Sequence, residues 1–164
     1  MSGIAPHQRR VRRGMSVAEL LISLAITALL LTAAAVAYTT SARAVEINDQ
    51  FFRASQSARV ALNQILTEIR RCQAAAVDEA AVVLELTTNA GESRTYAYVP
   101  DNRTLTMTIA NGGVNTVYTL ARNVETMSFL TDDATITMLI RIAVGNNSIT
   151  LNGSALPRRS VTYQ

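Results

Sequence analysis

The sequence predicts an α+β protein in which one long N-terminal α-helix packs against a C-terminal antiparallel β-sheet. Residues 15–90 contain no glycine and no proline, so a helix that starts near residue 15 meets no residue that would break it. After residue 78 the helical spacing of apolar residues gives way to short alternating segments separated by turn residues. We therefore divide the chain into a basic leader (1–14), an apolar helix (15–38), its amphipathic continuation (39–77) and a β domain (78–164).

The segment from Met15 to Tyr38 is apolar apart from one charged residue, Glu19. As a helix it extends about 36 Å at roughly 1.5 Å per residue, enough to cross a hydrocarbon core of about 30 Å. Four arginines and no acidic residue stand directly before it, at positions 9, 10, 12 and 13. Because basic residues keep their flank of a span in the cytoplasm, we expect the C-terminal part of the chain on the other side. A carboxylate near the start of a span costs on the order of 1–3 kcal/mol, so Glu19 needs a partner.

Beyond the span the helical period continues to Val77, with apolar residues on one face and polar residues on the other. The predicted apolar face consists of Ile47, Phe51, Ala54, Ala58, Leu62, Ile65, Ile69, Cys72 and Ala76. The predicted polar face consists of Glu46, Asp49, Arg53, Arg59, Asn63, Glu68 and Arg70. Only this second half of the helix can pack against a soluble domain, because the first half is apolar all round.

The last part of the chain reads as six to eight short strands. We predict strands over 82–88, 93–99, 104–110, 114–120, 124–130 and 135–144, and weaker strands over 148–152 and 159–163. Asn111-Gly112-Gly113 is the strongest hairpin signal. Strands that follow one long helix favour an antiparallel sheet with one face against that helix.

The start of the chain, GMSVAELLISLAI after a basic leader, resembles the processing site of type IV prepilins and pseudopilins. The resemblance implies a pilin-like fold and cleavage by prepilin peptidase between Gly14 and Met15, with N-methylation of Met15. It also implies that Glu19 pairs with the free amine of a neighbouring subunit. An ammonium and a carboxylate are each costly in low dielectric alone and much less so together. The family usually has Phe where Met15 stands.

Three other interpretations of this segment stay open. A secretory signal peptide would use the same arginines and a cut among the small residues 33–37, but it would place Glu19 inside its apolar region. A plain signal-anchor helix leaves Glu19 unexplained. A twin-arginine export signal lacks the expected residues after its arginine pair.

The composition argues against catalysis and metal binding. His7 is the only histidine, it lies in the leader, and the chain has no lysine. The mature chain thus has no imidazole base, no Ser-Lys pair and no histidine ligand, so we expect no enzyme, no cofactor and no metal. We interpret the pairs Asp78-Glu79 and Asp132-Asp133 as solvated charges. The alternative for Asp132 and Asp133 is a calcium site, but the sequence lacks the oxygen-rich ligand loop of a strong site. Cys72 reads as a small buried hydrophobe.

The distribution of charge argues against nucleic acid as a partner. The leader holds four of the 15 basic and none of the 12 acidic residues. The basic pI of about 9.5 is therefore due to the leader arginines, which we interpret as a signal for orientation in the membrane. Arg158 and Arg159 lack aromatic neighbours that would stack on bases. Arg70 and Arg71 suit the end of a helix and could contact a neighbouring subunit. Asn123-Val124 and a terminal arginine resemble, more loosely, J-type minor pseudopilins and W-type minor pilins.

These observations favour a minor pilin or pseudopilin of a type IV pilus or type II secretion filament. The expected partners are other pilin or pseudopilin subunits, prepilin peptidase, an inner-membrane assembly platform and, before assembly, membrane lipid. The expected location is the bacterial inner membrane, single-pass, with a cytoplasmic N-terminus and a periplasmic or extracellular C-terminal domain. The alternative is a signal-anchored, extracytoplasmic β-rich binding module that enters no filament, for which Glu19 would be dispensable and Gly14 tolerant of change.

Overall fold

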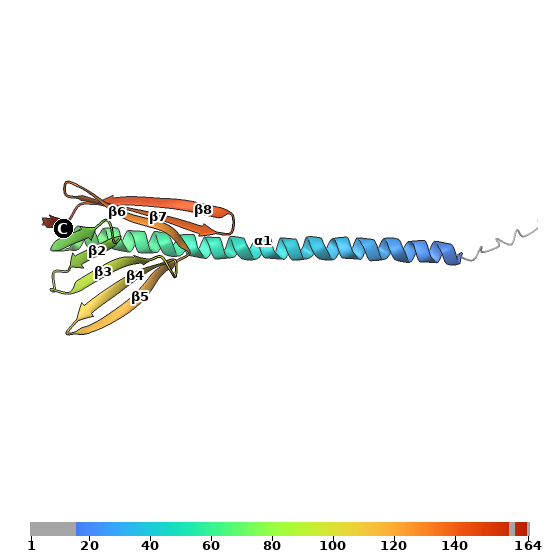
Figure 1. The fold of residues 1–164 in the computed structure, drawn as a ribbon, viewed down its shortest axis with the longest axis horizontal. Coiled ribbons are helices and arrows are strands. Elements are labelled where there is room, and N and C mark those ends of the chain that lie inside the picture. The colour runs from blue at the N-terminus through green and yellow to red at the C-terminus, as the bar shows by residue number, and fades with distance from the viewer. Residues whose placement is uncertain (1–15, 158–159, 164) are drawn as a thin grey trace, which may run out of the picture. The chain divides into compact units, whose positions relative to one another are not determined.

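The computed structural model describes residues 16–157 and 160–163 and has the predicted α+β architecture (Figure 1). One helix, α1 (Val17–Arg71), precedes all the strands. The strands are β1 (Ala74–Asp78), β2 (Val83–Thr87), β3 (Ser93–Val99), β4 (Thr104–Asn111), β5 (Val114–Arg122), β6 (Val124–Asp132), β7 (Thr135–Val144), β8 (Asn147–Ala155) and β9 (Ser160–Tyr163). The chain divides into two compact units, one up to Arg43 and one from Ala44. α1 continues across this boundary, and the two units are described separately below.

The helix ends earlier than the sequence predicts. We expected it to reach Val77, but the last helical turn closes where the Cys72 N–H donates to the Glu68 carbonyl oxygen at 2.8 Å. The Gln73 N–H then donates to the Thr87 carbonyl oxygen at 2.8 Å, and residues 74–78 form β1. Alanine is a good helix former, yet Ala75 and Val77 are buried in the sheet. Here pairing with β2 overrides intrinsic propensity.

The strands form two sheets, where we expected one. The first has six strands in the order β5-β4-β3-β2-β1-β9, and the second has three in the order β6-β7-β8. All described pairs are antiparallel except β1 with β9, which is parallel. The chain passes from the first sheet to the second at Asn123, whose φ of 60° lies in the left-handed region. Asparagine tolerates this region better than most residues, which explains its place in the sharp change of direction.

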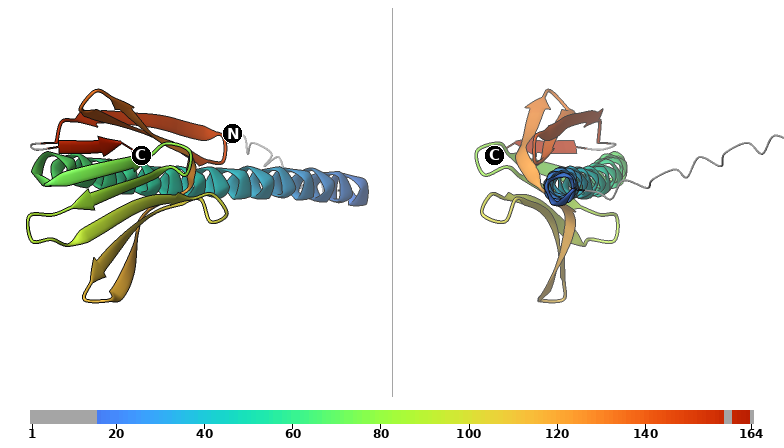
Figure 2. Two further views of the ribbon diagram at one scale, coloured as in Figure 1. Left: turned by 60° about the vertical axis from the view of Figure 1, so that its left-hand side comes forward. Right: turned by 90° about the vertical axis from the view of Figure 1, so that its right-hand side faces the viewer.

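From Ala44 onward, α1 packs against both sheets (Figure 2). Its buried face consists of Ala54, Ser55, Ala58, Ala61, Leu62, Ile65, Leu66 and Ile69. The small alanines let the strands approach the helix closely, and Gly153 of β8 does the same from the strand side. A Cβ atom added at Gly153 would lie 2.5 Å from Leu66 Cδ1, so a larger residue does not fit without displacement.

The strands supply the rest of the core. Their largest fully buried side chains are Leu84, Leu86, Tyr96, Leu105, Val124, Phe129, Ile136, Met138, Ile140 and Ile142. Burying a large apolar side chain stabilises a fold by about 1.5–3 kcal/mol. The unit from Ala44 therefore has a core of its own.

Candidate functional site

The N-terminal unit consists, in its described part, of the first half of α1. Ser16 begins the helix as its N-cap, since the Ala18 N–H donates to Ser16 Oγ at 3.3 Å and the Leu20 N–H donates to the Ser16 carbonyl oxygen at 3.1 Å. The predicted processing residues Gly14 and Met15 lie outside the described residues. The predicted assembly residue, Glu19, lies in the first helical turn.

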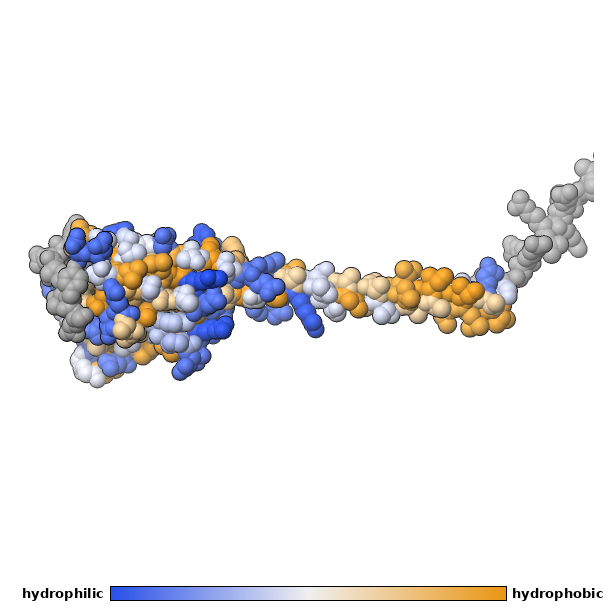
Figure 3. Space-filling view, turned by 45° about the horizontal axis from the view of Figure 1, so that its top comes forward, coloured by the Kyte–Doolittle hydropathy of each residue, from blue (hydrophilic) through white to orange (hydrophobic). Residues whose placement is uncertain are grey.

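The apolar side chains of this half are exposed on every side. All residues from Ser16 to Gln50 are solvent-accessible, and the apolar window of α1 has 0% of its residues buried. Figure 3 shows the first part of α1 covered by apolar surface. Among the described residues α1 is the one helix long and apolar enough to cross a membrane. In water such a surface is unfavourable, so it indicates contact with lipid or with other proteins.

Hydroxyl side chains within this apolar half are satisfied by the helix itself. Ser23 Oγ donates to the Glu19 carbonyl oxygen at 2.8 Å, Thr27 Oγ1 to that of Ser23 at 2.7 Å, and Thr32 Oγ1 to that of Ala28 at 2.8 Å. Such internal bonds let a helix carry hydroxyl groups into an apolar environment without unpaired donors. They are consistent with a segment that lies in lipid or between packed helices.

The carboxylate of Glu19 has no hydrogen-bond or ion-pair partner among the described residues. At this position it lies close to the positive end of the helix dipole, which favours an acidic residue. The spacing between Ser16 and Glu19 is also that of a capping box, in which the Glu19 side chain would accept a hydrogen bond from the Ser16 N–H. Two roles therefore compete for Glu19, one within the helix and one toward another molecule.

The second half of α1 contains a polar cluster that the sequence reasoning missed. Glu68 was expected on the solvent-facing side, but it turns toward the six-stranded sheet. Arg94 Nη1 donates to Glu68 Oε1 at 2.8 Å, and the Tyr96 hydroxyl donates to Glu68 Oε2 at 2.5 Å. Arg94 Nη2 also contacts Glu92 Oε2 at 3.3 Å, while Gln64 Nε2 reaches Glu68 Oε1 at 3.4 Å. The pair from β3, Arg94 and Tyr96, joins α1 to the sheet through charge-assisted bonds.

The cluster shifts the protonation equilibria of its members. Burial raises the pKa of Tyr96, and the bond to the Glu68 carboxylate and the charge of Glu68 raise it further, so the phenol stays neutral. Burial alone would lower the pKa of Arg94, but the charge of Glu68 and the hydrogen bonds to Glu92 and Glu68 raise it overall. In the sheet, Tyr96 lies opposite Leu84 of β2 and Arg94 lies opposite Leu86, so both side chains are on the face that carries these two buried leucines.

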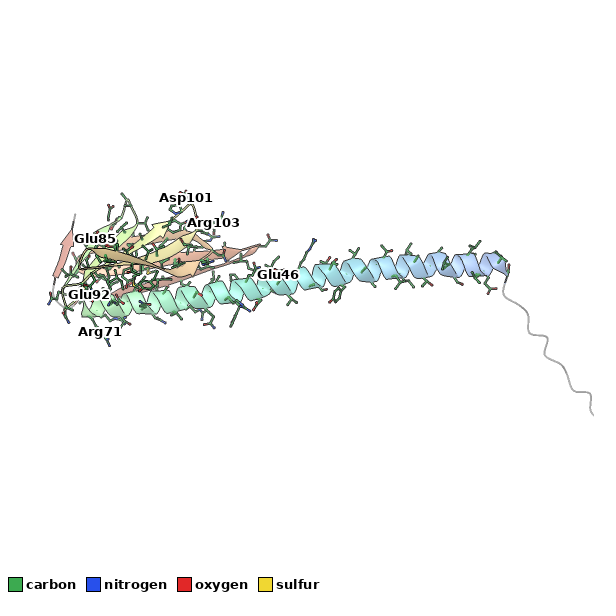
Figure 4. All side chains as sticks on the ribbon, turned by 90° about the horizontal axis from the view of Figure 1, so that it is seen from below. Glu46, Arg71, Glu85, Glu92, Asp101 and Arg103 are labelled. Atoms are coloured by element: carbon green, nitrogen blue, oxygen red, sulfur yellow. The ribbon has the colours of Figure 1, made fainter. Side chains whose placement is uncertain are left out.

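A groove of about 650 Å³ runs beside this cluster between α1 and the sheet. Glu68 and Arg94 line it together with Val60, Asn63, Gln64, Thr67, Thr88 and Asn89. Arg71, at the end of α1, also borders the groove, and Figure 4 shows its side chain directed away from the strands. Arg70 and Arg71 lie in the last turn of the helix, where their charges suit the negative end of the helix dipole.

The other residues singled out from the sequence have local roles. Cys72 is 3% exposed, its thiol donates to the Ile69 carbonyl oxygen at 3.1 Å, and burial raises its pKa, so it is a buried and weakly reactive thiol. Asp78 Oδ1 accepts from the Ala81 N–H at 2.9 Å, and Glu79 Oε1 accepts from the Thr131 N–H at 2.9 Å.

The structure shows no metal site at the paired carboxylates. Asp132 and Asp133 are exposed at the β6–β7 turn, and no three potential metal-ligating side chains gather anywhere among the described residues. Arg158 and Arg159 lie outside the described residues.

Comparison with known proteins finds no match: no family model, no curated protein and no solved structure shows significant similarity to this chain.

Proposed function

We propose that this chain is a subunit of a type IV pilin-like filament, either a minor pilin or a type II secretion pseudopilin. The observation that carries the proposal is the first half of α1, which is apolar on all sides, wholly exposed and interrupted by one unpartnered carboxylate. The sequence directly before it supports the proposal, because four arginines and Gly14 precede Met15 in the order that a prepilin leader requires.

The proposed mechanism gives this half of α1 two environments in turn. Before assembly lipid covers it, with the arginines of the leader holding its N-terminal end in the cytoplasm. Prepilin peptidase then cuts after Gly14, and the new amine at Met15 is methylated. In the filament, the same apolar side chains pack against the helices of other subunits, so their burial is retained when the helix leaves the membrane.

In this mechanism, the carboxylate of Glu19 favours the transfer of a subunit from the membrane into the filament. A carboxylate near the start of a span is destabilising, and an ammonium at Met15 of an adjacent subunit would be destabilising there too. Each group offsets most of the other's desolvation once they pair. The transfer of a subunit from the assembly platform to the filament would therefore be coupled to the formation of this pair.

Processing is the first test of the proposal. When the chain is co-expressed with a prepilin peptidase, mass spectrometry of the membrane-extracted protein should give Met15, methylated, as the first residue. A Gly14→Leu variant should keep its leader under the same conditions. An intact leader in the unmodified chain, or a start near Ala35, would reject the filament proposal.

Substitution of Glu19 separates its two competing roles. Glu19→Gln keeps a side chain that can cap the helix but removes the charge, whereas Glu19→Asp keeps the charge. If Glu19 pairs with an ammonium, Gln should abolish incorporation into filaments as completely as Ala does, while Asp retains part of it. Membrane insertion, measured by carbonate extraction, should be unchanged in all three variants. Full incorporation of the Gln variant would show that the charge is not required.

The alternative function is an anchored, extracytoplasmic binding module. The observation that favours it is β5, the outer strand of the six-stranded sheet, whose first six residues are all exposed. That function predicts that the Glu19→Ala variant is fully active and that a Gly14 variant with an intact leader behaves like the unmodified chain. The two functions thus differ in experiments on the same two residues.

A further inference from the structure

The groove between α1 and the six-stranded sheet combines an apolar floor with polar walls. Its volume of about 650 Å³ lies within the roughly 300–1,000 Å³ that is typical of ligand sites. Cys72 and Leu86 line it and are 3% and 1% exposed, so the floor is apolar. The uncharged polar residues that line it are Asn63, Gln64, Thr67, Thr88 and Asn89. Their amide and hydroxyl groups both donate and accept hydrogen bonds, as the groups of a peptide backbone do.

The two ends of the groove differ in chemistry. At one end lies Val60, a large apolar side chain that is 63% exposed. At the other end lies Arg71, in the last turn of α1. At roughly 1.5 Å per residue the two are about 16 Å apart along the helix, close to three full turns, so they lie on the same side of it. An extended chain rises about 3.3 Å per residue, so about five residues span this distance.

Arg71 supplies the unpaired charge of the groove. The charged residues that line the groove are Glu68, Arg71 and Arg94. Arg94 Nη1 lies 2.8 Å from Glu68 Oε1, so these two charges neutralise each other. Arg71 takes part in none of the ion pairs of the described residues. Because a guanidinium binds a carboxylate through two parallel N–H···O bonds, charge complementarity favours a ligand with a carboxylate at this end.

We propose that this groove binds a short, extended segment of another protein, with an acidic side chain at Arg71 and an apolar side chain against Val60. The amides and hydroxyls between these two ends bind the backbone of the segment. A small free carboxylate would contact Arg71 and leave the apolar end empty, whereas about five extended residues occupy both ends. The inference goes beyond filament formation and does not rest on it.

The acidic residues of the chain itself are not placed to fill the groove of a second copy. All 12 lie in the part of the chain that the structure describes. Each is in α1, in a paired strand or in a turn between two strands. None of them therefore lies on a free extended segment that could enter a groove between a helix and a sheet. This is the reason for assigning the groove to another protein.

Nuclear magnetic resonance of the full-length protein in detergent micelles tests the groove. The probe is the blocked peptide acetyl-Leu-Ser-Ser-Ser-Glu-amide, whose one charge is its carboxylate, together with the peptide of reverse order, because the groove does not fix the direction of the segment. One of the two should shift the side-chain amide signals of Asn63, Gln64 and Asn89 in a saturable way. The side-chain amide signals of Asn115 and Asn147, which lie outside the groove, should stay unchanged.

Two arginine variants test the cationic end. Arg71→Gln should weaken peptide binding about tenfold, because a charge-assisted bond is lost. Arg70→Gln is the matched control, since Arg70 lies in the same last turn but does not line the groove, and its affinity should equal that of the unmodified protein. A peptide with glutamine in place of glutamate should bind the unmodified protein about tenfold more weakly. It should bind the Arg71→Gln variant as tightly as the acidic peptide does, which assigns the loss to this one contact.

Two valine variants test the apolar end. Val60→Ser should weaken binding of the acidic peptide about threefold, because its apolar residue loses a contact. Val45→Ser is the matched control, since Val45 is also exposed on α1, at 69%, but does not line the groove. Its affinity should equal that of the unmodified protein. Both positions are exposed, so neither variant removes a core side chain.

Four results would overturn the proposal. They are groove amides that neither peptide shifts, equal losses of affinity in the Arg70→Gln and Arg71→Gln variants, decanoate shifting the same amides at lower concentration than either peptide, and shifts that appear without peptide as protein concentration rises. The third result would assign the groove to a lipid and the fourth to a second copy of the chain. None of these readouts involves Gly14, Met15 or Glu19. A chain that is not processed but binds the acidic peptide through Arg71 would therefore refute the filament and not the groove.

Discussion

Glu19 and Glu68 are the same residue type on the same helix, and the structure treats them in opposite ways. Glu68 lies in the unit from Ala44 and is bound by Arg94 and Tyr96, both from β3. Glu19 lies in the unit up to Arg43 and has no side-chain partner among the described residues. The second half of α1 therefore has its packing partners within the chain, whereas the described part of the first half is exposed.

The apolar residues of the two halves differ in the same way. In the second half the apolar side chains lie on one face, and Ala58, Ile65 and Ile69 are fully buried there. In the first half Leu21, Leu24 and Leu30 are each more than half exposed, although they are as apolar. The apolar character of a residue therefore does not distinguish a buried position from an exposed position on this helix; the presence of polar residues on the opposite face of the helix does.

Removing Glu68 should have the largest effect on stability. Glu68→Ala leaves the buried Tyr96 hydroxyl without its acceptor and leaves Arg94 with Glu92 alone, which should lower the free energy of unfolding of the β-rich unit by about 3 kcal/mol. Urea unfolding in detergent micelles, followed by circular dichroism, would measure this loss. Glu19→Ala is the matched control and should change the same quantity by less than about 0.5 kcal/mol. Equal losses of unfolding free energy in the Glu68→Ala and Glu19→Ala variants would contradict the conclusion that only the second half of α1 packs within the folded unit.

Replacing an alanine with leucine should affect stability in the second half of α1 but not in the first, and by less than the loss of Glu68. Ala58 is 0% exposed, so Ala58→Leu overpacks the space between helix and sheets and should cost about 2 kcal/mol. Ala28→Leu makes the same change in the first half, where the side chain faces outward, and should leave the unfolding free energy of the β-rich unit unchanged. The same unfolding experiment compares them. A loss in the Ala28→Leu variant as large as that of Ala58→Leu would show that the first half contributes to the folded unit.

Much of this architecture was predictable because its signals are local. β3 and β7 begin and end where alternation predicted, and the two glycines at the β4–β5 turn have the positive φ angles that the hairpin needs. The second half of α1 buries most of its predicted apolar face, since helical spacing alone sets which side chains share a face.

The errors arose where distant segments decide the outcome. β1 was predicted as helix, because its alanines favour one, and only pairing with β2 and β9 makes it a strand. Glu68 was placed on the polar face because its partners lie more than twenty residues away, at Arg94 and Tyr96. Nothing in the local pattern near Glu68 shows that β3 brings an arginine and a tyrosine to it. The chain also passes from one sheet to the other at a single left-handed residue, Asn123.

The smallest predicted effect concerns Tyr96 and depends on pH. Tyr96→Phe removes one hydrogen bond to Glu68 and should cost about 1.5 kcal/mol at pH 8, the low end for a bond to a charged group, because Glu68 keeps Arg94 and Gln64. In the unfolded chain the phenol ionises near pH 10, whereas in the folded protein its pKa is raised, chiefly by burial. The folded state then binds more protons than the unfolded state above that pH, so stability falls as pH rises.

The raised pKa of Tyr96 predicts the direction in which the stability of the protein changes with pH. The contribution of the raised pKa is fully present below about pH 10 and decreases by up to about 1.4 kcal/mol for each pH unit above it. The unmodified protein should therefore lose its advantage over Tyr96→Phe between pH 10 and 11, and unfolding curves at pH 8, 10 and 11 would measure it. Tyr118→Phe, at an exposed position on β5, is the control and should show no such convergence. If the difference in unfolding free energy between the Tyr96→Phe and unmodified proteins stays constant up to pH 11, the phenol ionises as readily in the folded chain as in the unfolded one. The hydrogen bond from Tyr96 to Glu68 would then be weaker than the geometry of the cluster indicates.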